Sequence, residues 1–189
     1  MIRKTSIYIE TGAYRGGGVA KVLNEYDQIH TIELSKKWFD FNIEKWSKHK
    51  HVNVHFGDSK VILPNLLDSI NQPVTIFLDA HYSGEHTAMG EEETPLLREL
   101  ELLKKREFDD VILIDDCRML GQVGQAGNGG EIYPFFDSDW SDITFDAIKL
   151  RLKSGYKIEW NGKSKDDANK ILKDYQYDVL ILHKPNNNE

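Results

Sequence analysis

The 189-residue sequence predicts an α/β protein with a doubly wound, mostly parallel sheet and helices on both faces. Three observations predict this fold class. Short apolar runs rich in β-branched residues alternate with segments of helical periodicity along the chain. A glycine-rich turn directly follows the first apolar run, and several later runs end on an acidic residue. Open α/β sheets bind ligands at the carboxyl ends of their strands, so these residues indicate a binding site.

The first half of the chain is expected to supply three strands and three helices. Trp38, Phe41 and Trp46 are spaced to share one face of the second helix. Asp58 is expected to cap the third helix, and Pro64 should kink that helix or delay its start. The expected elements are, in order, a strand at 6–10, a helix at 19–26, a strand at 28–34, a helix at 35–49, a strand at 51–57 and a helix at 58–70.

The second half continues the alternation, and its first two strands are the most apolar and therefore central. Thr94 is the expected N-cap of the helix between them, with Pro95 at its first helical position. Residues 121–136 are glycine-rich and predict a long, mobile loop. The last two strands have a short connection, which favours an antiparallel final strand. The expected elements are a strand at 74–79, a helix at 94–105, a strand at 110–115, a helix at 141–153 and strands at 156–160 and 177–184.

Length and composition predict a single domain, residues 1–185, with a polar tail at residues 186–189. The net charge of -7 and the lack of a long basic run argue against binding to a nucleic-acid backbone. No apolar stretch approaches the roughly 20 residues that cross a bilayer, so no membrane association is expected. The first strand begins within a few residues of Met1, so no signal peptide is expected. With Cys117 as the single cysteine, no internal disulfide can form, and a cytoplasmic location is predicted.

The glycine turn is the first indication of a ligand. Glu10 ends the first strand, and Gly12 and Gly16 follow in the run E-T-G-A-Y-R-G. Glycines at this turn let a ligand approach the backbone and leave the N–H groups of the next helix pointing at it. Glycine-rich turns also occur without a ligand, so the neighbouring strand ends have to be considered with this one.

Two further strand ends point to a nucleoside. Glu33 ends the second strand about twenty residues after the turn, where a carboxylate can accept both hydroxyl groups of a ribose. Asp58 and Ser59 follow the third strand, at a position suited to the edge of an adenine ring. The glycine spacing differs from G-x-G-x-x-G, so an adenosyl site is favoured over a dinucleotide site.

These segments resemble the class I S-adenosylmethionine-dependent methyltransferases, which have a Rossmann-like sheet, and most of all the catechol O-methyltransferase group. That group carries a turn E-x-G-A-Y-x-G, matched here from Glu10 to Gly16, and an acidic residue in I-T-I-E, matched by Glu33. The segments VNVHFGDSKVILPNLL, FLDAH and ILIDDC match its next strand ends in order, so the resemblance covers residues 6–120. It implies methyl transfer from S-adenosyl-L-methionine to a hydroxyl group of a small molecule or sugar. The residues that it implies for the cofactor are Glu10, Gly12, Tyr14, Gly16, Glu33, Asp58, Ser59 and Asp79.

The resemblance also implies one Mg²⁺ ion, held by Asp79, Asp115 and Asp116. A physical argument supports a cation at this place. Three carboxylates that converge at the ends of adjacent strands repel one another unless a cation or protons neutralise them. Such an ion would bind a substrate hydroxyl group and lower its pKa.

Two departures from the group's pattern affect catalysis. The lysine that serves as general base in the catechol enzymes is replaced by Tyr82, with His81 beside it. We expect these two residues at the catalytic position, with His81 either as the base or as a ring that flanks the adenine. Only about five residues precede the first strand, so we expect the site to lack the helices that cover the substrate in related enzymes. Cover would come from residues 83–93, from the loop after Asp116, or from a second subunit of a homodimer.

Three functions from different classes therefore stay open. The first is a metal-dependent O-methyltransferase. The second is a metal-dependent hydrolase that uses Asp79, His81, Asp115 and Asp116, because D-A-H after a strand also resembles the arginase and deacetylase group. That group continues D-x-H-x-D, and the fifth place here is Ser83. The third is a module that binds an adenosyl group without catalysis.

Overall fold

The computed structural model describes residues 2–84, 87–125, 137–160 and 179–185. The strands are β1 (Ile7–Thr11), β2 (Gln28–Glu33), β3 (Val52–Phe56), β4 (Thr75–Leu78), β5 (Val111–Ile114), β6 (Val123–Gln125), β7 (Asp137–Asp139), β8 (Lys157–Trp160) and β9 (Leu180–His183). The helices are α1 (Gly17–Val22), α2 (Lys36–Trp46), α3 (Ser59–Asp68), α4 (Leu96–Lys104) and α5 (Phe145–Leu150), with a 3₁₀ turn at Cys117–Met119.

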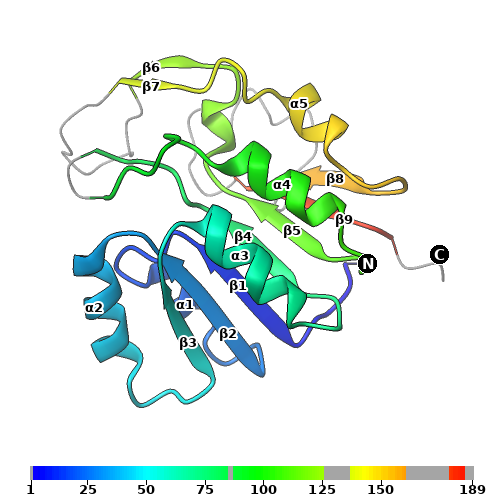
Figure 1. Ribbon diagram of the computed structural model, residues 1–189. Helices are drawn as coiled ribbons and strands as arrows, with labels where there is room; N and C mark the ends of the chain where they lie inside the picture. The colour runs from blue at the N-terminus through cyan, green and yellow to red at the C-terminus, as the bar shows by residue number, and fades with distance from the viewer. Residues whose placement is uncertain (1, 85–86, 126–136, 161–178, 186–189) are drawn as a thin grey trace.

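Seven of the strands form one sheet in the order β3-β2-β1-β4-β5-β9-β8 (Figure 1). The first five pair in parallel. β9 runs antiparallel to both β5 and β8. The predicted fold class, a doubly wound and mostly parallel sheet with an antiparallel last strand, is confirmed. All the parallel strands therefore end at the same edge, which is where the acidic strand ends were expected to meet.

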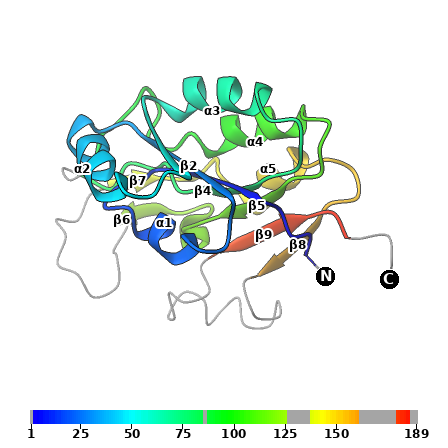
Figure 2. The same ribbon diagram turned by 90° about the horizontal axis from the view of Figure 1, so that it is seen from below.

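Helices cover both faces of this sheet, as Figure 2 shows for α3 and α4 on one side and α1 on the other. The larger core lies under α3, α4 and α5, where Leu63, Leu100 and Ile148 are fully buried against the central strands. A smaller core lies under α1 and α2 and contains Val19 and Trp46. The central strands are buried on both faces, which explains their continuous apolar runs.

Two expectations for the helices are wrong in detail. Phe41 does not share the buried face of α2, because Asn42 lies between Trp38 and Trp46 in the buried row, at helical spacing of four residues, and Phe41 is exposed. α4 is capped by Pro95 rather than by Thr94. The Pro95 carbonyl oxygen accepts the N–H group of Glu99 at 3.0 Å, so the first helical hydrogen bond begins one residue later than expected.

Other expectations hold with different bounds. Asp58 caps α3 by accepting the N–H group of Lys60 at 2.9 Å, and α3 starts at Ser59 and runs through Pro64 without a delayed start. α5 is shorter than the expected helix and has Thr144 as its N-cap. Within the segment expected to be a loop, residues 123–125 form β6, which pairs antiparallel with β7 just after that segment. Residues 126–136 of that loop and the tail at 186–189 lie outside the described residues. Among the helices that the structure describes, none is long and apolar enough to cross a membrane.

Candidate functional site

A cavity of about 290 Å³ lies at the carboxyl ends of β1, β2, β3, β4 and β5. Its volume is at the lower end of the roughly 300–1,000 Å³ of small-molecule sites. The structure thus brings together most of the residues predicted from the sequence. Those that line the cavity are Gly12, Tyr14, Glu33, Asp58, Ser59, Asp79, His81, Tyr82, Asp115 and Asp116. Two predicted residues, Glu10 and Gly16, lie outside this lining.

The glycine turn forms the wall between β1 and β4. Gly12 has a positive φ of 86°, and a Cβ atom there would overlap the carbonyl oxygen of Asp79. Only glycine therefore lets the two strand ends approach so closely. Gly16 has a φ of 68° and caps α1, and a Cβ atom there would overlap the side chain of Asn42. Gly16 thus serves the packing of the turn against α2.

Glu33 fixes the opposite side of the turn. Its Oε2 accepts the N–H group of Tyr14 at 2.7 Å, and its Oε1 accepts the N–H group of Ser35 at 2.6 Å. Burial raises the pKa of Glu33, while these backbone hydrogen bonds act in the opposite direction. Each carboxylate oxygen can accept a second hydrogen bond, so the group can still receive the hydroxyl groups of a sugar.

Glu10 lies beneath the turn rather than in the cavity. Its side chain is 1% exposed and accepts a hydrogen bond from the Thr31 hydroxyl at 2.7 Å. Burial raises its pKa to about 8. A Cβ atom at Gly18 would overlap Glu10 Oε1, so the close packing of α1 over this carboxyl group requires glycine there. Glu10 therefore supports the turn from below.

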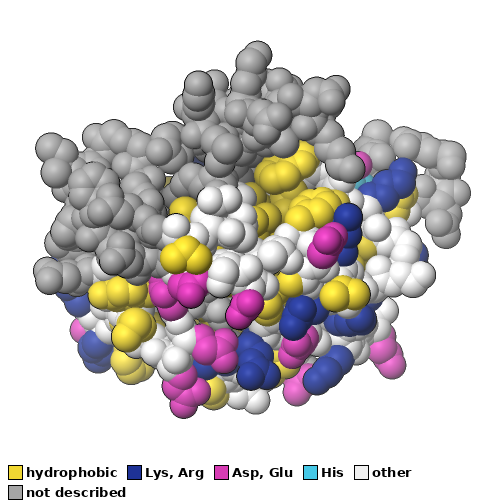
Figure 3. Space-filling view, turned by 90° about the horizontal axis from the view of Figure 1, so that it is seen from above, with side chains coloured by type: hydrophobic (Ala, Val, Ile, Leu, Met, Phe, Trp, Pro, Cys, Tyr) yellow, Lys and Arg dark blue, Asp and Glu magenta, His cyan; other side chains and the backbone are white. Residues whose placement is uncertain are grey.

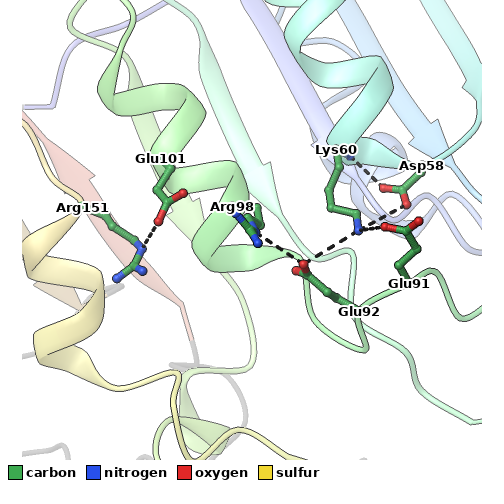
Figure 4. A network of polar contacts seen from close by, with 7 residues as sticks. All are labelled: Asp58, Lys60, Glu91, Glu92, Arg98, Glu101 and Arg151. Atoms are coloured by element: carbon green, nitrogen blue, oxygen red, sulfur yellow. Dashed lines mark hydrogen bonds and ion pairs between the residues drawn. The ribbon is translucent and has the colours of Figure 1, made fainter.

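The loop between β4 and α4 lines a third side of the cavity. The side chain of Lys60, at the start of α3, lies 3.4 Å from Glu91 and 4.0 Å from Glu92 of this loop, and 3.9 Å from Asp58 (Figure 4). Arg98 of α4 pairs with the same Glu92 at 3.4 Å (Figure 4). The ion pairs join the loop to the strand ends that it covers.

The side of the cavity at the ends of β4 and β5, called the fourth wall below, holds a group of one histidine and two aspartates. His81 Nε2 lies 2.8 Å from Asp116 Oδ2, and His81 Nδ1 lies 3.4 Å from Asp79 Oδ1. Burial alone would lower the pKa of His81, but the charges and hydrogen bonds of both carboxylates outweigh it and raise this pKa well above its usual value. One ligand atom from each of the three residues lies within 4.8 Å of the others, which is close enough to hold one metal ion.

Asp115 lines the cavity but does not belong to this group of three. Burial, together with the charges of Asp79 and Asp116, raises its pKa to about 7. Asp116 adopts a left-handed conformation with a φ of 54°, so the two adjacent aspartates do not continue the strand geometry. The donors that converge therefore include an imidazole nitrogen and are not the all-oxygen set that Mg²⁺ prefers.

Three residues that contribute to the site were missed by sequence reasoning. Asn42 is fully buried and donates to the carbonyl oxygen of Tyr14 at 2.6 Å. Glu99 of α4 is 1% exposed, and its carboxyl group interacts with the hydroxyl groups of Ser59 and Thr11. The third is Lys60. A polar residue at a buried helical position, as Asn42 and Glu99 are, is the one signal that the sequence offered for these contacts.

Comparison with solved structures identifies the fold. A candidate methyltransferase from Streptococcus mutans, in complex with S-adenosylhomocysteine (SAH), matches 97% of this chain and 91% of its own, with 12% identity and a TM-score of 0.57. A candidate rRNA methylase from Clostridium thermocellum matches the same shares at 12% identity and a TM-score of 0.60. The SAH-bound methyltransferase PaMTH1 of Podospora anserina matches 96% of this chain and 72% of its own, at 16% identity and a TM-score of 0.56. The protein therefore has the fold of the class I S-adenosylmethionine-dependent methyltransferases.

Sequence comparison adds little to this result. No protein-family model matches the chain. The pre-mRNA-splicing ATP-dependent RNA helicase PRP28 of Scheffersomyces stipitis is 33% identical over 70 residues, which is 36% of this chain and 14% of the helicase. A match to such a small part of a much longer protein carries no argument about the site.

Proposed function

We propose that the protein binds S-adenosylmethionine in the cavity and transfers its methyl group to a hydroxyl group of a small molecule, with the help of a divalent metal ion. One observation carries the proposal. The glycine turn and Glu33 are joined directly, through the hydrogen bond from the Tyr14 N–H group, and both line the cavity. This arrangement places a turn that a ligand can approach closely beside a carboxylate that can accept ribose hydroxyl groups, as an adenosyl ligand requires.

Each wall has a task in this function. Glu33 would accept the ribose hydroxyl groups, and Asp58 with Ser59 would contact the adenine edge. The turn at Gly12 would receive the methionine part close to Asp79. Transfer of the methyl group is an in-line displacement, so the positioning of the two reactants supplies much of the rate. A bound divalent metal would supply a Lewis acid that lowers the pKa of the acceptor hydroxyl.

The proton of that hydroxyl needs an acceptor in the fourth wall. His81 and Tyr82, the two residues predicted from the sequence, both line the cavity. Both ring nitrogens of His81 already face carboxylates, which makes the ring a poor acceptor in this arrangement. We therefore assign proton acceptance to Asp115, which lines the cavity outside the group of three, and orientation of the acceptor molecule to Tyr82, which lines the same cavity.

A small molecule is favoured over a nucleic acid as the acceptor. The net charge is -7, and on the face drawn in Figure 3 basic and acidic side chains of the described residues are interspersed. The described residues on this face show no cluster of positive charge of the kind that supplies most of the affinity for a phosphate backbone. Because some structural neighbours are named as rRNA methylases, RNA is the control substrate for this proposal.

Calorimetric titration with SAH tests the proposal. Micromolar binding to the wild type is expected, and Glu33→Gln should weaken it about tenfold or more, because a charged acceptor of two hydrogen bonds is lost. Glu44→Gln, which changes an exposed glutamate of α2, is the matched control and should bind like the wild type. Turnover is then measured with labelled S-adenosylmethionine, compounds with vicinal hydroxyl groups and, separately, RNA. No SAH binding with or without metal ions would sink the methyltransferase proposal.

A metal-dependent hydrolase is the second candidate, and the group of Asp79, His81 and Asp116 is the observation that favours it. A hydrolase of this kind would need the metal and a water molecule but no adenosyl ligand. A hydrolase would make no use of the glycine turn or of Glu33. Metal binding without SAH binding would favour this candidate.

A further inference from the structure

The donor atoms at the ends of β4 and β5 do not match the Mg²⁺ site expected from the sequence. That site used the three carboxylates Asp79, Asp115 and Asp116. In the structure the atoms that converge are one imidazole nitrogen and two carboxylates, from His81, Asp79 and Asp116. We infer that these three residues form a mixed nitrogen and oxygen site for a later first-row transition-metal ion, of the class of Zn²⁺ and Co²⁺, in preference to Mg²⁺.

The spacing of the donor atoms supports a shared ion. His81 Nε2 and Asp116 Oδ2 lie 2.8 Å apart. Two ligands at right angles around a metal, each bound at about 2.0–2.1 Å, lie about 2.9 Å apart. His81 and Asp116 thus already have the separation of neighbouring ligands. The side chains of His81 and Asp116 are only 16% and 11% exposed, so the ion would be largely shielded from bulk water.

The surroundings of the imidazole hold it at both ring nitrogens. Nδ1 lies 3.4 Å from Asp79 Oδ1, and Nε2 lies 2.8 Å from the Ser83 hydroxyl oxygen as well as from Asp116. The ring edge of Trp140 packs against the imidazole, with centroids 5.8 Å apart, and restricts its rotation. The ring is therefore held in one orientation before any ion arrives.

An independent observation comes from a small cavity behind this group. It has a volume of about 10 Å³, roughly the space of one water molecule, and Asp79, His81, Thr94 and Glu99 belong to its lining. Within the described part of the chain, Glu99 Oε1 and Thr94 Oγ1 are buried and have no hydrogen-bond partner. Buried polar atoms are almost always paired, so these two call for a partner in the cavity. A water molecule bound to the metal ion would donate one O–H group to each of them.

The preference for a transition metal follows from the imidazole. Mg²⁺ favours an octahedron of oxygen ligands and loses its water molecules reluctantly, whereas imidazole nitrogen suits Zn²⁺, Co²⁺ and related ions. The inference rests on the proposed function only in the catalytic use of the metal ion, because the existence of the site is argued from its geometry alone. An experiment can therefore refute metal binding without refuting SAH binding, and the reverse.

The test compares Co²⁺ and Mg²⁺ by calorimetry, with the visible absorption of bound Co²⁺ as a second readout. The wild type should bind Co²⁺ at least about a hundredfold more tightly than Mg²⁺. His81→Ala should weaken Co²⁺ binding at least about tenfold and change its visible spectrum, while Mg²⁺ binding stays within about threefold. His51→Ala is the matched control, since His51 is a half-buried histidine that contacts the Leu23 carbonyl group far from the site in sequence and fold.

Several outcomes would overturn the inference. They are equal binding of the two ions, no binding of Co²⁺, or an unchanged Co²⁺ affinity and spectrum in His81→Ala. If His81→Ala fails to fold by circular dichroism, His81→Asn takes its place, because its NH₂ group can still donate to one of the carboxylates while an amide is a weak ligand. SAH is titrated into the same samples. SAH binding without Co²⁺ binding would refute the metal site alone, and the reverse result would refute the methyltransferase proposal alone.

Discussion

Asn42 of α2 donates a hydrogen bond of 2.6 Å to the carbonyl oxygen of Tyr14, in the middle of the glycine turn. The same amide group accepts a hydrogen bond of 3.0 Å from the Trp46 indole N–H group. Asn42 thereby fixes a residue with an unusual positive φ of 43°, whose N–H group is held by Glu33 on the other side. Two hydrogen bonds from different elements thus hold the turn in the shape that a ligand would meet.

The first prediction concerns this support. Asn42→Leu should weaken SAH binding about tenfold and lower the free energy of unfolding by about 1–3 kcal/mol, because it leaves the Tyr14 carbonyl and the Trp46 N–H group buried without partners. Calorimetry and urea unfolding measure the two effects. Asn65→Leu is the control: Asn65 makes a similar bond to the Val61 carbonyl, but on the exposed side of α3, and little change is expected. Equal effects from the two substitutions would contradict the role of Asn42.

The second prediction concerns the loop over the cavity. Gly90 of this loop lies close to the Asp58 carboxylate and the Leu34 side chain, beside the predicted adenine position. Lys60→Met removes the ion pairs with Glu91 and Glu92. Exposed ion pairs contribute about 0–1 kcal/mol, so both the association and dissociation rates of SAH should rise by up to about fivefold with little change in affinity.

Stopped-flow measurement at low and high salt checks the loop prediction. High salt should raise the association and dissociation rates of SAH in the wild type toward those of Lys60→Met, because salt screens the same ion pairs. Lys36→Met is the control, since it removes an exposed ion pair with Asp40 on α2. Rates that do not change in Lys60→Met would show that the loop does not control entry.

The residues predicted from the sequence and those missed differ in the range of their contacts. Gly12, Glu33 and Asp79 could be predicted because a parallel sheet brings every strand end to one edge. Lys60 could not, because its partners depend on how a loop about thirty residues later folds back. The position of Asn42 under the turn likewise depends on the packing of α2 and not on any local pattern.

The fourth wall shows why neighbouring residues in sequence need not act together. The pair Asp115 and Asp116 was predicted to bind one metal ion as a unit. The left-handed backbone of Asp116 brings its carboxylate to His81 at 2.8 Å, whereas Asp115 lies outside the group of three. A positive φ at a residue other than glycine comes from tertiary packing, and a sequence pattern does not reveal it.

The third prediction concerns stability at the other edge of the sheet. Arg106 pairs with Asp110 at 2.8 Å and donates to the carbonyl groups of Leu67 and Gln72, and Asp110 also accepts the Val74 N–H group at 3.0 Å. Arg106→Ala should lower the free energy of unfolding by about 3–5 kcal/mol, because it leaves the Asp110 carboxylate buried without its cation.

Urea unfolding measures this loss, and the double variant Arg106→Ala with Asp110→Asn serves as its control. The double variant should recover part of the stability, because the isolated charge is gone. Arg98→Ala, which removes a pair with the exposed Glu92, should cost less than about 1 kcal/mol. A loss below about 1 kcal/mol in Arg106→Ala would show that water reaches Asp110.

The fourth prediction concerns pH and the carboxyl group beneath the glycine turn. Burial raises the pKa of Glu10 to about 8 from an ordinary value of 4.5. The folded state then binds a proton that the unfolded state releases between these two pH values. The stability that Glu10 contributes is therefore complete below pH 4.5, falls as the pH rises to about 8, and is constant above it. The slope within this window is at most about 1.4 kcal/mol per pH unit.

Glu10→Gln keeps an acceptor for the Thr31 hydroxyl without a titrating group, so its advantage over the wild type in urea unfolding should grow from pH 5 to pH 8. Subtracting the two curves cancels the other titrating groups, such as His30, whose pKa burial lowers to about 4. A difference that does not change with pH would mean that Glu10 is ionised in the folded protein, and that a cation or water reaches it beneath the turn.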